Sequence, residues 1–332
     1  MPGTCRRSSL VAALLLMLSC SAVPAASGDL AIVAAGRPLA TPGGVAISPD
    51  GKTLYVSDWG ASAIFRVPVR GGAPTVLASL ESTGFSGFNQ LRSLALAPDG
   101  QTLYVAGWGT GTVFKVSTAT KALALLFRAP DVGLCSPHGV AVSPDGLVLY
   151  VTDNLCGRVY RTPSAGGAPV LVAEGLREPL DVAVSPDGNW LYVAAGAASV
   201  YRVPAGGGAP ELLASGPPLV RPAGIAVSPD GTTLVIVDDA GFKGQPPSAL
   251  YTLPAAGGAL SLLHAGEPLL YPPAGEVSPD GRTFFVADCG YDAIGTVYRL
   301  ELGRTAAVAI KPGSPPNSAS PGKAKAWSRW PS

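Results

Sequence analysis

Short apolar runs alternate with turn-forming residues along most of this chain, and the alternation repeats. Proline presets φ for the first position of a tight turn, and glycine accepts the positive φ that such a hairpin demands. The turn Ser-Pro-Asp-Gly begins at Ser48, Ser143, Ser185, Ser228 and Ser278, with Ala97-Pro98-Asp99-Gly100 as a sixth variant. The turn prolines stand at positions 49, 98, 144, 186, 229 and 279, so one unit recurs every 42 to 50 residues.

Each unit is predicted to contain short β-strands around its turn. In the first unit the strands are Gly44-Val45-Ala46-Ile47, Leu54-Tyr55-Val56, Ile64-Phe65-Arg66-Val67 and Thr75-Val76-Leu77. Four short antiparallel strands in a unit of this length are typical of a propeller blade. No apolar stretch beyond the first residues has the spacing of an amphipathic helix. We therefore predict an all-β, six-bladed β-propeller of four-stranded antiparallel blades over residues 29–303.

The sixth unit supplies only three strands and ends near Leu300. The segment Leu30-Ala31-Ile32-Val33-Ala34-Ala35-Gly36 resembles the fourth strands of other units, such as Glu211-Leu212-Leu213-Ala214-Ser215-Gly216. Pairing this N-terminal strand with the last blade would close the ring and remove an exposed sheet edge.

The first 28 residues are predicted to be a signal peptide. Arg6 and Arg7 precede an apolar run at 10–18, which is too short to span a membrane comfortably. Met17-Leu18-Ser19-Cys20 resembles a bacterial lipobox, which would make Cys20 the lipidated first residue of a lipoprotein. Val23-Pro24-Ala25 fits ordinary cleavage, which would release a secreted or periplasmic protein. Both alternatives place the chain outside the bacterial cytoplasm, with a lipid anchor as its only membrane link.

Charge and composition limit the classes of partner that the sequence leads us to expect. Charged residues make up 14% of the chain and the formal net charge is +1. An electrostatically driven nucleic-acid binder needs a strong basic excess, so nucleic acid is not an expected partner. Residues 304–332 are rich in Pro and Ser and lack the repeat, so we expect a disordered tail. We expect the chain to be a monomer.

The third unit carries a family resemblance. The run Pro137-His138-Gly139-Val140-Ala141-Val142-Ser143-Pro144-Asp145-Gly146, followed by Leu149-Tyr150-Val151-Thr152-Asp153, is similar to NHL repeats and to the gluconolactonase and strictosidine-synthase-like six-bladed propellers. The likeness covers roughly residues 29–303. These propellers include lyases, lactonases and binding modules, so the resemblance indicates fold rather than activity. It implies that any site lies around the channel, where loops enter the first strand and join the second strand to the third.

The resemblance also suggests enzymatic candidates. Lyases of this kind place metal-binding histidines directly before the first strand, where this chain has His138; the matching positions hold Gly43, Arg92, Leu180, Ala223 and Pro273. One histidine cannot build a zinc site, which needs three or four protein ligands. Gluconolactonase-like enzymes use an Asn or Asp at this position plus a Glu. Asp181 stands one position later, and Glu276 replaces an alanine found in the other five units. His138 and Glu276 are the catalytic candidates.

Carboxylates at the ends of second strands could hold a cation. Asp58, Asp153, Asp238 and Asp288 occupy this position in four units. Calcium prefers oxygen ligands, so it is the candidate cofactor, although such an aspartate more often accepts hydrogen bonds from backbone amides of its own loop. The candidate metal ligands are Asp153, Asp181, Asp288 and Glu276.

Aromatic residues are the strongest indication of a binding site. Trp59 and Trp108 occupy matching loops of the first two units. Phe85, Phe88 and Arg92 follow on the long connection between them, and Tyr291 extends the patch from the sixth unit. Aromatic rings beside a few polar groups suit a small molecule, glycan, peptide or protein, although they also suit loop packing over a blade seam. A binding protein is therefore the leading functional hypothesis, and a metal-dependent hydrolase or lyase resembling gluconolactonase-like propellers is the alternative.

One disulfide is expected. Cys135 and Cys156 enter and leave the same face of the third unit, in a compartment that permits disulfides. Cys289 belongs to the sixth unit, opposite in the ring.

Overall fold

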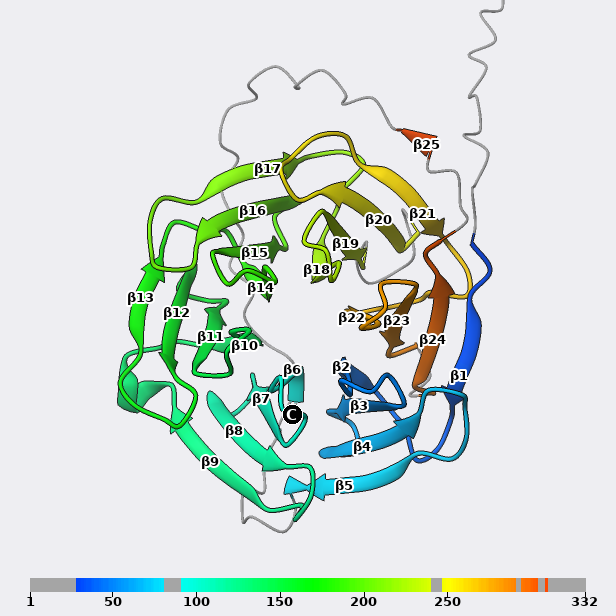
Figure 1. The fold of residues 1–332 in the computed structure, drawn as a ribbon, viewed down its shortest axis with the longest axis horizontal. Helices are drawn as coiled ribbons and strands as arrows, with labels where there is room; N and C mark the ends of the chain where they lie inside the picture. Colours follow the sequence, from blue (N-terminus) through cyan, green and yellow to red (C-terminus); the bar gives the residue numbers. More distant parts are fainter. Residues whose placement is uncertain (1–27, 81–90, 240–246, 291–293, 304–307, 310–332) are drawn as a thin grey trace, which may run out of the picture.

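The computed structural model describes residues 28–80, 91–239, 247–290, 294–303 and 308–309. In this part of the chain, six antiparallel sheets stand around a central channel like the blades of a propeller (Figure 1). In blades 1 to 5 chain order runs outward from the channel, because each strand of a blade pairs with the next strand of the chain. The predicted six-bladed propeller of four-stranded blades is confirmed.

The strands occupy equivalent places in the six blades. The innermost strands, in blade order, are β2 (Pro42–Ile47), β6 (Leu91–Leu96), β10 (Pro137–Val142), β14 (Pro179–Val184), β18 (Pro222–Val227) and β22 (Ala274–Val277). The second strands are β3 (Thr53–Asp58), β7 (Thr102–Gly107), β11 (Val148–Asp153), β15 (Trp190–Ala195), β19 (Thr233–Asp238) and β23 (Thr283–Asp288). The third strands are β4 (Ala63–Pro68), β8 (Thr112–Ser117), β12 (Arg158–Pro163), β16 (Ser199–Pro204), β20 (Ala249–Pro254) and β24 (Thr296–Glu301).

The outermost strands complete the blades. They are β5 (Thr75–Ser79), β9 (Leu123–Arg128), β13 (Val170–Ala173), β17 (Glu211–Ser215), β21 (Ser261–Ala265) and β1 (Ala31–Ala35). A short 3-10 helix, η2 (Pro130–Val132), follows β9. Blade 6 has the strand order β1-β24-β23-β22, so the N-terminal strand is its outer strand. Ile32 pairs with Tyr298 and Ala35 pairs with Thr296, as the predicted ring closure requires.

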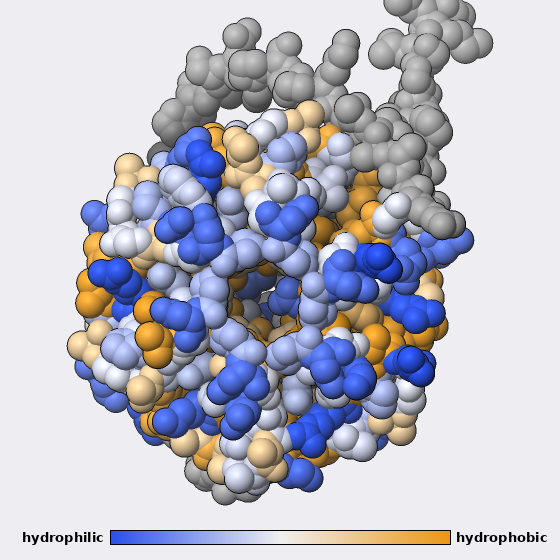
Figure 2. All heavy atoms as spheres, in the orientation of Figure 1, coloured by the Kyte–Doolittle hydropathy of each residue, from blue (hydrophilic) through white to orange (hydrophobic). Residues whose placement is uncertain are grey.

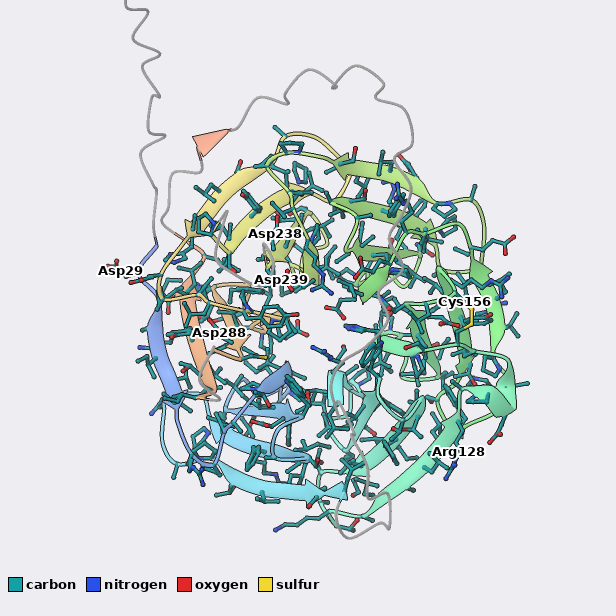
Figure 3. The ribbon with its side chains drawn as sticks, turned by 180° about the vertical axis from the view of Figure 1, so that it is seen from behind. Asp29, Arg128, Cys156, Asp238, Asp239 and Asp288 are labelled. Carbon is teal, nitrogen blue, oxygen red and sulfur yellow. A yellow bond between two sulfur atoms is a disulfide. The ribbon has the colours of Figure 1, made fainter. Side chains whose placement is uncertain are left out.

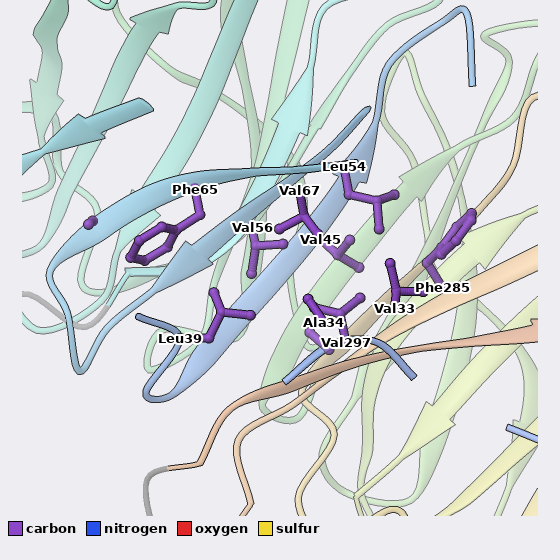
Figure 4. Close-up of a cluster of buried hydrophobic side chains, with 12 residues drawn as sticks. Val33, Ala34, Leu39, Val45, Leu54, Val56, Phe65, Val67, Phe285 and Val297 are labelled. Atoms are coloured by element: carbon purple, nitrogen blue, oxygen red, sulfur yellow. The ribbon is translucent and has the colours of Figure 1, made fainter. Parts of the chain in front are cut away.

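The hydrophobic core is divided among the seams between neighbouring blades. At the closing seam, Val33 of β1 packs with Val45 of blade 1 and Phe285 of blade 6 (Figure 4). Comparable buried clusters fill the other seams. A blade therefore buries its apolar faces only when both neighbours are present, which makes closure of the ring energetically important.

The Ser-Pro-Asp-Gly turns are held by a repeated hydrogen-bond pattern. In blade 1, Ser48 Oγ donates to Asp50 Oδ1 over 2.6 Å and accepts from Thr53 N over 2.9 Å. Gly51 has a φ of 69°, which favours glycine. We call the face of the propeller that carries the Ser-Pro-Asp-Gly turns the turn face. Figure 2 shows one face of the propeller, with hydrophilic side chains gathered around the central opening.

Two residues of the C-terminal segment have a defined place. Val308 and Ala309 form β25, which pairs with Leu262 and Ser261 of β21. The outer edge of β21 offers unpaired backbone groups to such a segment. Residues 1–27 and the remainder of the tail lie outside the described residues. Within the described residues, no helix is long and apolar enough to cross a membrane.

Candidate functional site

The opposite face of the propeller carries the loops where a site was expected. These loops lead into the innermost strands and join the second strands to the third, and we call this side the mouth face. Figure 3 views the molecule from behind, with Asp238, Asp239 and Asp288 labelled on blades 5 and 6 and Cys156 labelled on the other side of the ring. Charged and aromatic side chains from several blades lie on the mouth face, and each blade contributes only a few of them.

The aspartates that end the second strands bind backbone amides. Asp58 Oδ2 accepts a hydrogen bond from Ala40 N over 2.7 Å, and Asp238 Oδ2 accepts one from Val220 N over 2.8 Å. Asp153 Oδ2 and Asp288 Oδ2 accept equivalent bonds over 2.8 Å and 2.7 Å. Asp58, Asp153 and Asp238 are at most 1% exposed, and Asp288 is 2% exposed. These carboxylates fix the loop before the innermost strand, which is the structural alternative considered from the sequence.

Cys135 and Cys156 form a disulfide in blade 3, with Cα atoms 5.8 Å apart. Asp153 lies close to both sulfur atoms, and these three residues are the only described group of His, Cys, Asp or Glu side chains with metal-ligand spacing. The sulfur atoms are bonded to each other and Asp153 accepts amide hydrogen bonds, so this group is a structural brace of the mouth loops. Cys289 is a buried free cysteine whose Sγ donates to Pro42 O over 3.0 Å.

The mouth face has an aromatic side on blades 1 and 2. The guanidinium carbon of Arg92 lies 5.3 Å from the centroid of the Trp59 ring and 5.7 Å from that of Trp108. Arg92 belongs to β6, whereas the tryptophans directly follow β3 and β7. The three side chains are half-buried, so the stack is a partly exposed, positively charged aromatic surface. The structure thus joins three residues that the sequence placed in one candidate patch.

The other side of the mouth face is ionic. Arg221 forms salt bridges with Asp239 of its own blade 5 and with Glu178 of blade 4, the latter over 3.3 Å. The Asp239 carboxylate, which is 1% exposed, and nearby Tyr271 and Glu178 raise the pKa of Arg221 despite its partial burial. No motif in the sequence marks this network. Its only sequence signal is charge at loop positions that differ between units, and charge alone does not reveal which loops meet.

His138 lies at the edge of the channel, half-buried. Its Nδ1 is 2.7 Å from the Leu180 carbonyl oxygen, which can only accept, so Nδ1 carries the proton. Desolvation and the positive charges of Arg92 and Arg221 lower the pKa of His138 to about 3. At neutral pH the ring is uncharged, and Nε2 keeps its lone pair.

Two carboxylates line the channel itself. Asp181 and Glu276, with the innermost strands of all six blades, surround a cavity of about 180 Å³. Asp181 is 7% exposed and accepts hydrogen bonds from Ser93 Oγ over 3.2 Å and from Ile225 N over 3.1 Å. Desolvation raises the pKa of Asp181 to about 7. Desolvation and the charge of Asp181 likewise raise the pKa of Glu276 to about 7.

The four candidate metal ligands are therefore divided. Asp181 and Glu276 share the channel cavity, whereas Asp153 and Asp288 brace loops on blades 3 and 6. His264, the other histidine, is 4% exposed on the outer strand β21 and contacts backbone carbonyls, including Glu267 O over 3.1 Å. Further candidates, namely Phe85, Phe88, Tyr291 and the lipidation candidate Cys20, lie outside the described residues.

The fold and its channel define a six-bladed β-propeller, and comparison with solved structures agrees. The β-propeller in the crystal structure of a nidogen/laminin complex matches with a TM-score of 0.62 at 17% identity, over 79% of this chain and 93% of the other. A PQQ-bound aldose sugar dehydrogenase from Streptomyces coelicolor matches with a TM-score of 0.62 at 19% identity, over 83% and 98%. Virginiamycin B lyase from Staphylococcus aureus matches with a TM-score of 0.58 at 15% identity, over 83% and 89%.

These similarities establish the fold and nothing finer. No protein-family model matches the sequence, and no curated protein matches it. The matched structures are binding and enzymatic propellers alike.

Proposed function

We propose that this chain is an exported binding propeller whose ligand occupies the mouth face beside Trp59, Arg92 and Trp108. The contact of Arg92 with both tryptophan rings carries this proposal. Aromatic rings supply large contact areas at a small entropic cost, and a guanidinium in contact with two rings loses less freedom when it forms hydrogen bonds to a ligand. The repeat resembles NHL repeats, and NHL-type propellers include binding modules. We favour a relationship to these binding propellers.

The two sides of the mouth face indicate the kind of ligand. The aromatic side suits the apolar surface of a sugar, peptide or planar small molecule. The ionic side, formed by Arg221, Asp239 and Glu178, offers paired charges that align polar groups at a smaller desolvation cost than lone charges. A ligand with one apolar and one polar surface fits this asymmetry, as glycans, peptides and protein loops do.

The test is capture on glycan and peptide arrays, followed by affinity measurement with two variants. Trp108→Asn introduces the residue found at the matching position of blade 3, Asn154, and Arg92→Ala removes the centre of the stack. We expect each variant to weaken binding about tenfold or more, as hot-spot residues do. The control Arg70→Ala removes an exposed cation from a turn on the other face and should leave the affinity within about twofold. Equal affinities in all variants would reject the mouth site.

A metal-dependent hydrolase or lyase is the second candidate, favoured by the carboxylates of the channel. Groups with strongly shifted pKa values often gather at catalytic sites, and Asp181 and Glu276 have such shifts in one cavity. His138, whose pKa is lowered to about 3, would accept a proton only weakly and would not serve as an acid at neutral pH. Near-stoichiometric calcium or zinc in elemental analysis of the purified protein, lost in Asp181→Asn, would favour this candidate.

Export is part of the proposal and rests on the sequence of the first 28 residues. Lipidation at Cys20 predicts a protein recovered with membranes, whose Cys20→Ser variant is released in soluble form. Cleavage near Ala25 predicts that the wild type and the Cys20→Ser variant are both recovered as soluble mature proteins. The mass of the mature N-terminal peptide distinguishes the two routes.

A further inference from the structure

A second candidate site lies on the turn face, in a groove between blades 4 and 5. The groove has a volume of about 340 Å³ and is lined by Trp190, Tyr192, Arg202, Asp187 and Asp230, among others. This volume falls within the range of about 300–1,000 Å³ typical of ligand clefts. The lining residues stand at the opposite strand ends from Trp59 and Trp108, so this groove is separate from the mouth face.

Trp190 in the groove and Glu211, which is bonded to the lining residue Arg202, break the repeat. Trp190 is the first residue of its second strand, and the other five blades have smaller residues there: Thr53, Thr102, Val148, Thr233 and Thr283. Glu211 pairs with Arg202 in the sheet, and the same place in the other blades is held by Thr75, Ala124, Val170, Ser261 and Ala31. Blade 4 alone therefore combines a tryptophan and a glutamate at these positions.

These side chains hold one another in place. The guanidinium carbon of Arg202 lies 4.5 Å from the centroid of the Trp190 ring. Arg202 also donates from Nε and a terminal nitrogen to Glu211 Oε2, over 3.1 Å and 2.6 Å. Tyr192 is the direct cross-strand neighbour of Arg202 and points to the same face of the sheet. The half-buried indole is thus fixed before any ligand arrives, which lowers the entropic cost of binding.

The charges of the groove select among ligand classes. Asp187 and Asp230 are exposed on the two turns that flank it, and hydrogen bonds from Ser185 and Ser228 lower their pKa values, so both carboxylates stay ionised. With Glu211, three carboxylates accompany one guanidinium, which disfavours an anionic ligand. Ionised carboxylates also disfavour a purely apolar ligand. The Trp190 ring is already stacked on Arg202, which leaves a second cation less to gain from it.

We propose that the groove between blades 4 and 5 binds a neutral saccharide, with Trp190 contacting the C–H surface of a sugar ring and Asp187 and Asp230 accepting hydrogen bonds from its hydroxyl groups. A sugar presents apolar C–H faces together with many hydroxyl donors, and the groove offers an aromatic ring beside charged acceptors. Arg202 and the Tyr192 hydroxyl supply donors for the remaining sugar oxygens.

The six-fold repeat provides a matched control. A groove of similar composition between blades 6 and 1 is lined by Asp50, Asp280 and Thr283, without a tryptophan. Asp280→Asn therefore changes the same kind of turn carboxylate outside the proposed site. Trp190→Thr restores the residue of blades 1, 2, 5 and 6. The double variant Asp187→Asn, Asp230→Asn changes the acceptors while retaining the stack of Trp190 on Arg202.

The experiment is ligand-observed saturation-transfer NMR of the mature protein with short cello-, malto-, xylo- and chito-oligosaccharides and, in a separate sample, with a lysine-rich peptide. Ligands that bind are then titrated. We expect binding by at least one series, weakened about tenfold by Trp190→Thr and by the double variant but changed less than about twofold by Asp280→Asn. Circular dichroism of each variant verifies that it is folded.

Three results would overturn the proposal. The first is no saturation transfer from any series, and the second is binding that Trp190→Thr and the double variant both leave unchanged. The third is binding of a lysine-rich peptide, lost in the double variant, without sugar binding, which would make the groove a site for cationic peptides. Because the mouth face is not involved, failure here leaves the proposed function untouched.

Discussion

The channel carboxylate of Asp181 leads to a prediction about stability. Asp181 is 7% exposed and accepts hydrogen bonds from Ser93 Oγ and Ile225 N, which belong to blades 2 and 5. Desolvation outweighs these bonds and raises its pKa from 3.8 to about 7. Asparagine has nearly the same shape and no charge to desolvate, so Asp181→Asn removes the titration while keeping one acceptor oxygen, which can serve Ser93 Oγ or Ile225 N but not both.

The size of the effect follows from the pKa shift. A rise from 3.8 to about 7 corresponds to roughly 4 kcal/mol, at about 1.4 kcal/mol per pKa unit. The folded state retains its proton up to about pH 7, whereas the unfolded chain loses it above pH 3.8. The free energy of unfolding therefore falls as the pH rises through this window, and the full loss is present above it. At a pH of about 8 the Asp181→Asn variant should be more stable than the wild type by roughly 2–4 kcal/mol, and near pH 4 the difference should vanish.

The assay is urea denaturation of both proteins at several pH values between about 4 and 8, with a chelator present to exclude metal binding. Glu276 has a raised pKa as well, so the Asp181→Asn variant should retain some of this slope. A variant that is less stable than the wild type at every pH would refute the reasoning. It would mean that the ionised carboxylate is stabilised by Ser93 and Ile225 more than it is destabilised by burial.

Two further predictions concern closure and cross-linking. Deleting residues 29–37 removes β1 and exposes the apolar seam between blades 6 and 1, where Val33 is only 6% exposed in the intact protein. The melting temperature should therefore fall by about 10 °C or more. An unchanged melting temperature would contradict ring closure through β1. Thiol titration of the denatured, unreduced mature protein should find Cys289 but neither Cys135 nor Cys156, with Cys20 left out of the count. Three reactive thiols would show that the blade 3 disulfide is absent in solution.

The number of blades, their strands and their turns could be predicted from the sequence because these features are local. Ser-Pro-Asp-Gly specifies a hairpin wherever it occurs, and six repeats of a four-stranded unit can bury their faces only by stacking into a ring. Closure by the N-terminal strand was also predictable, because the sixth unit has only three strands and the segment 30–36 is a strand that belongs to no other unit. The pairing of Cys135 with Cys156 needed only the knowledge that both flank the same hairpin.

Only the tertiary structure decided which side chains meet, because those contacts depend on how neighbouring blades rotate around the channel. Ser93 and Asp181 are 88 residues apart, yet they share a hydrogen bond inside the ring. Arg92 was a candidate beside two tryptophans, but its contact with both rings follows from the way blades 1 and 2 pack together. Asp153 and Asp288 resemble free metal ligands in sequence, and the packing of their loops shows that backbone amides bind them.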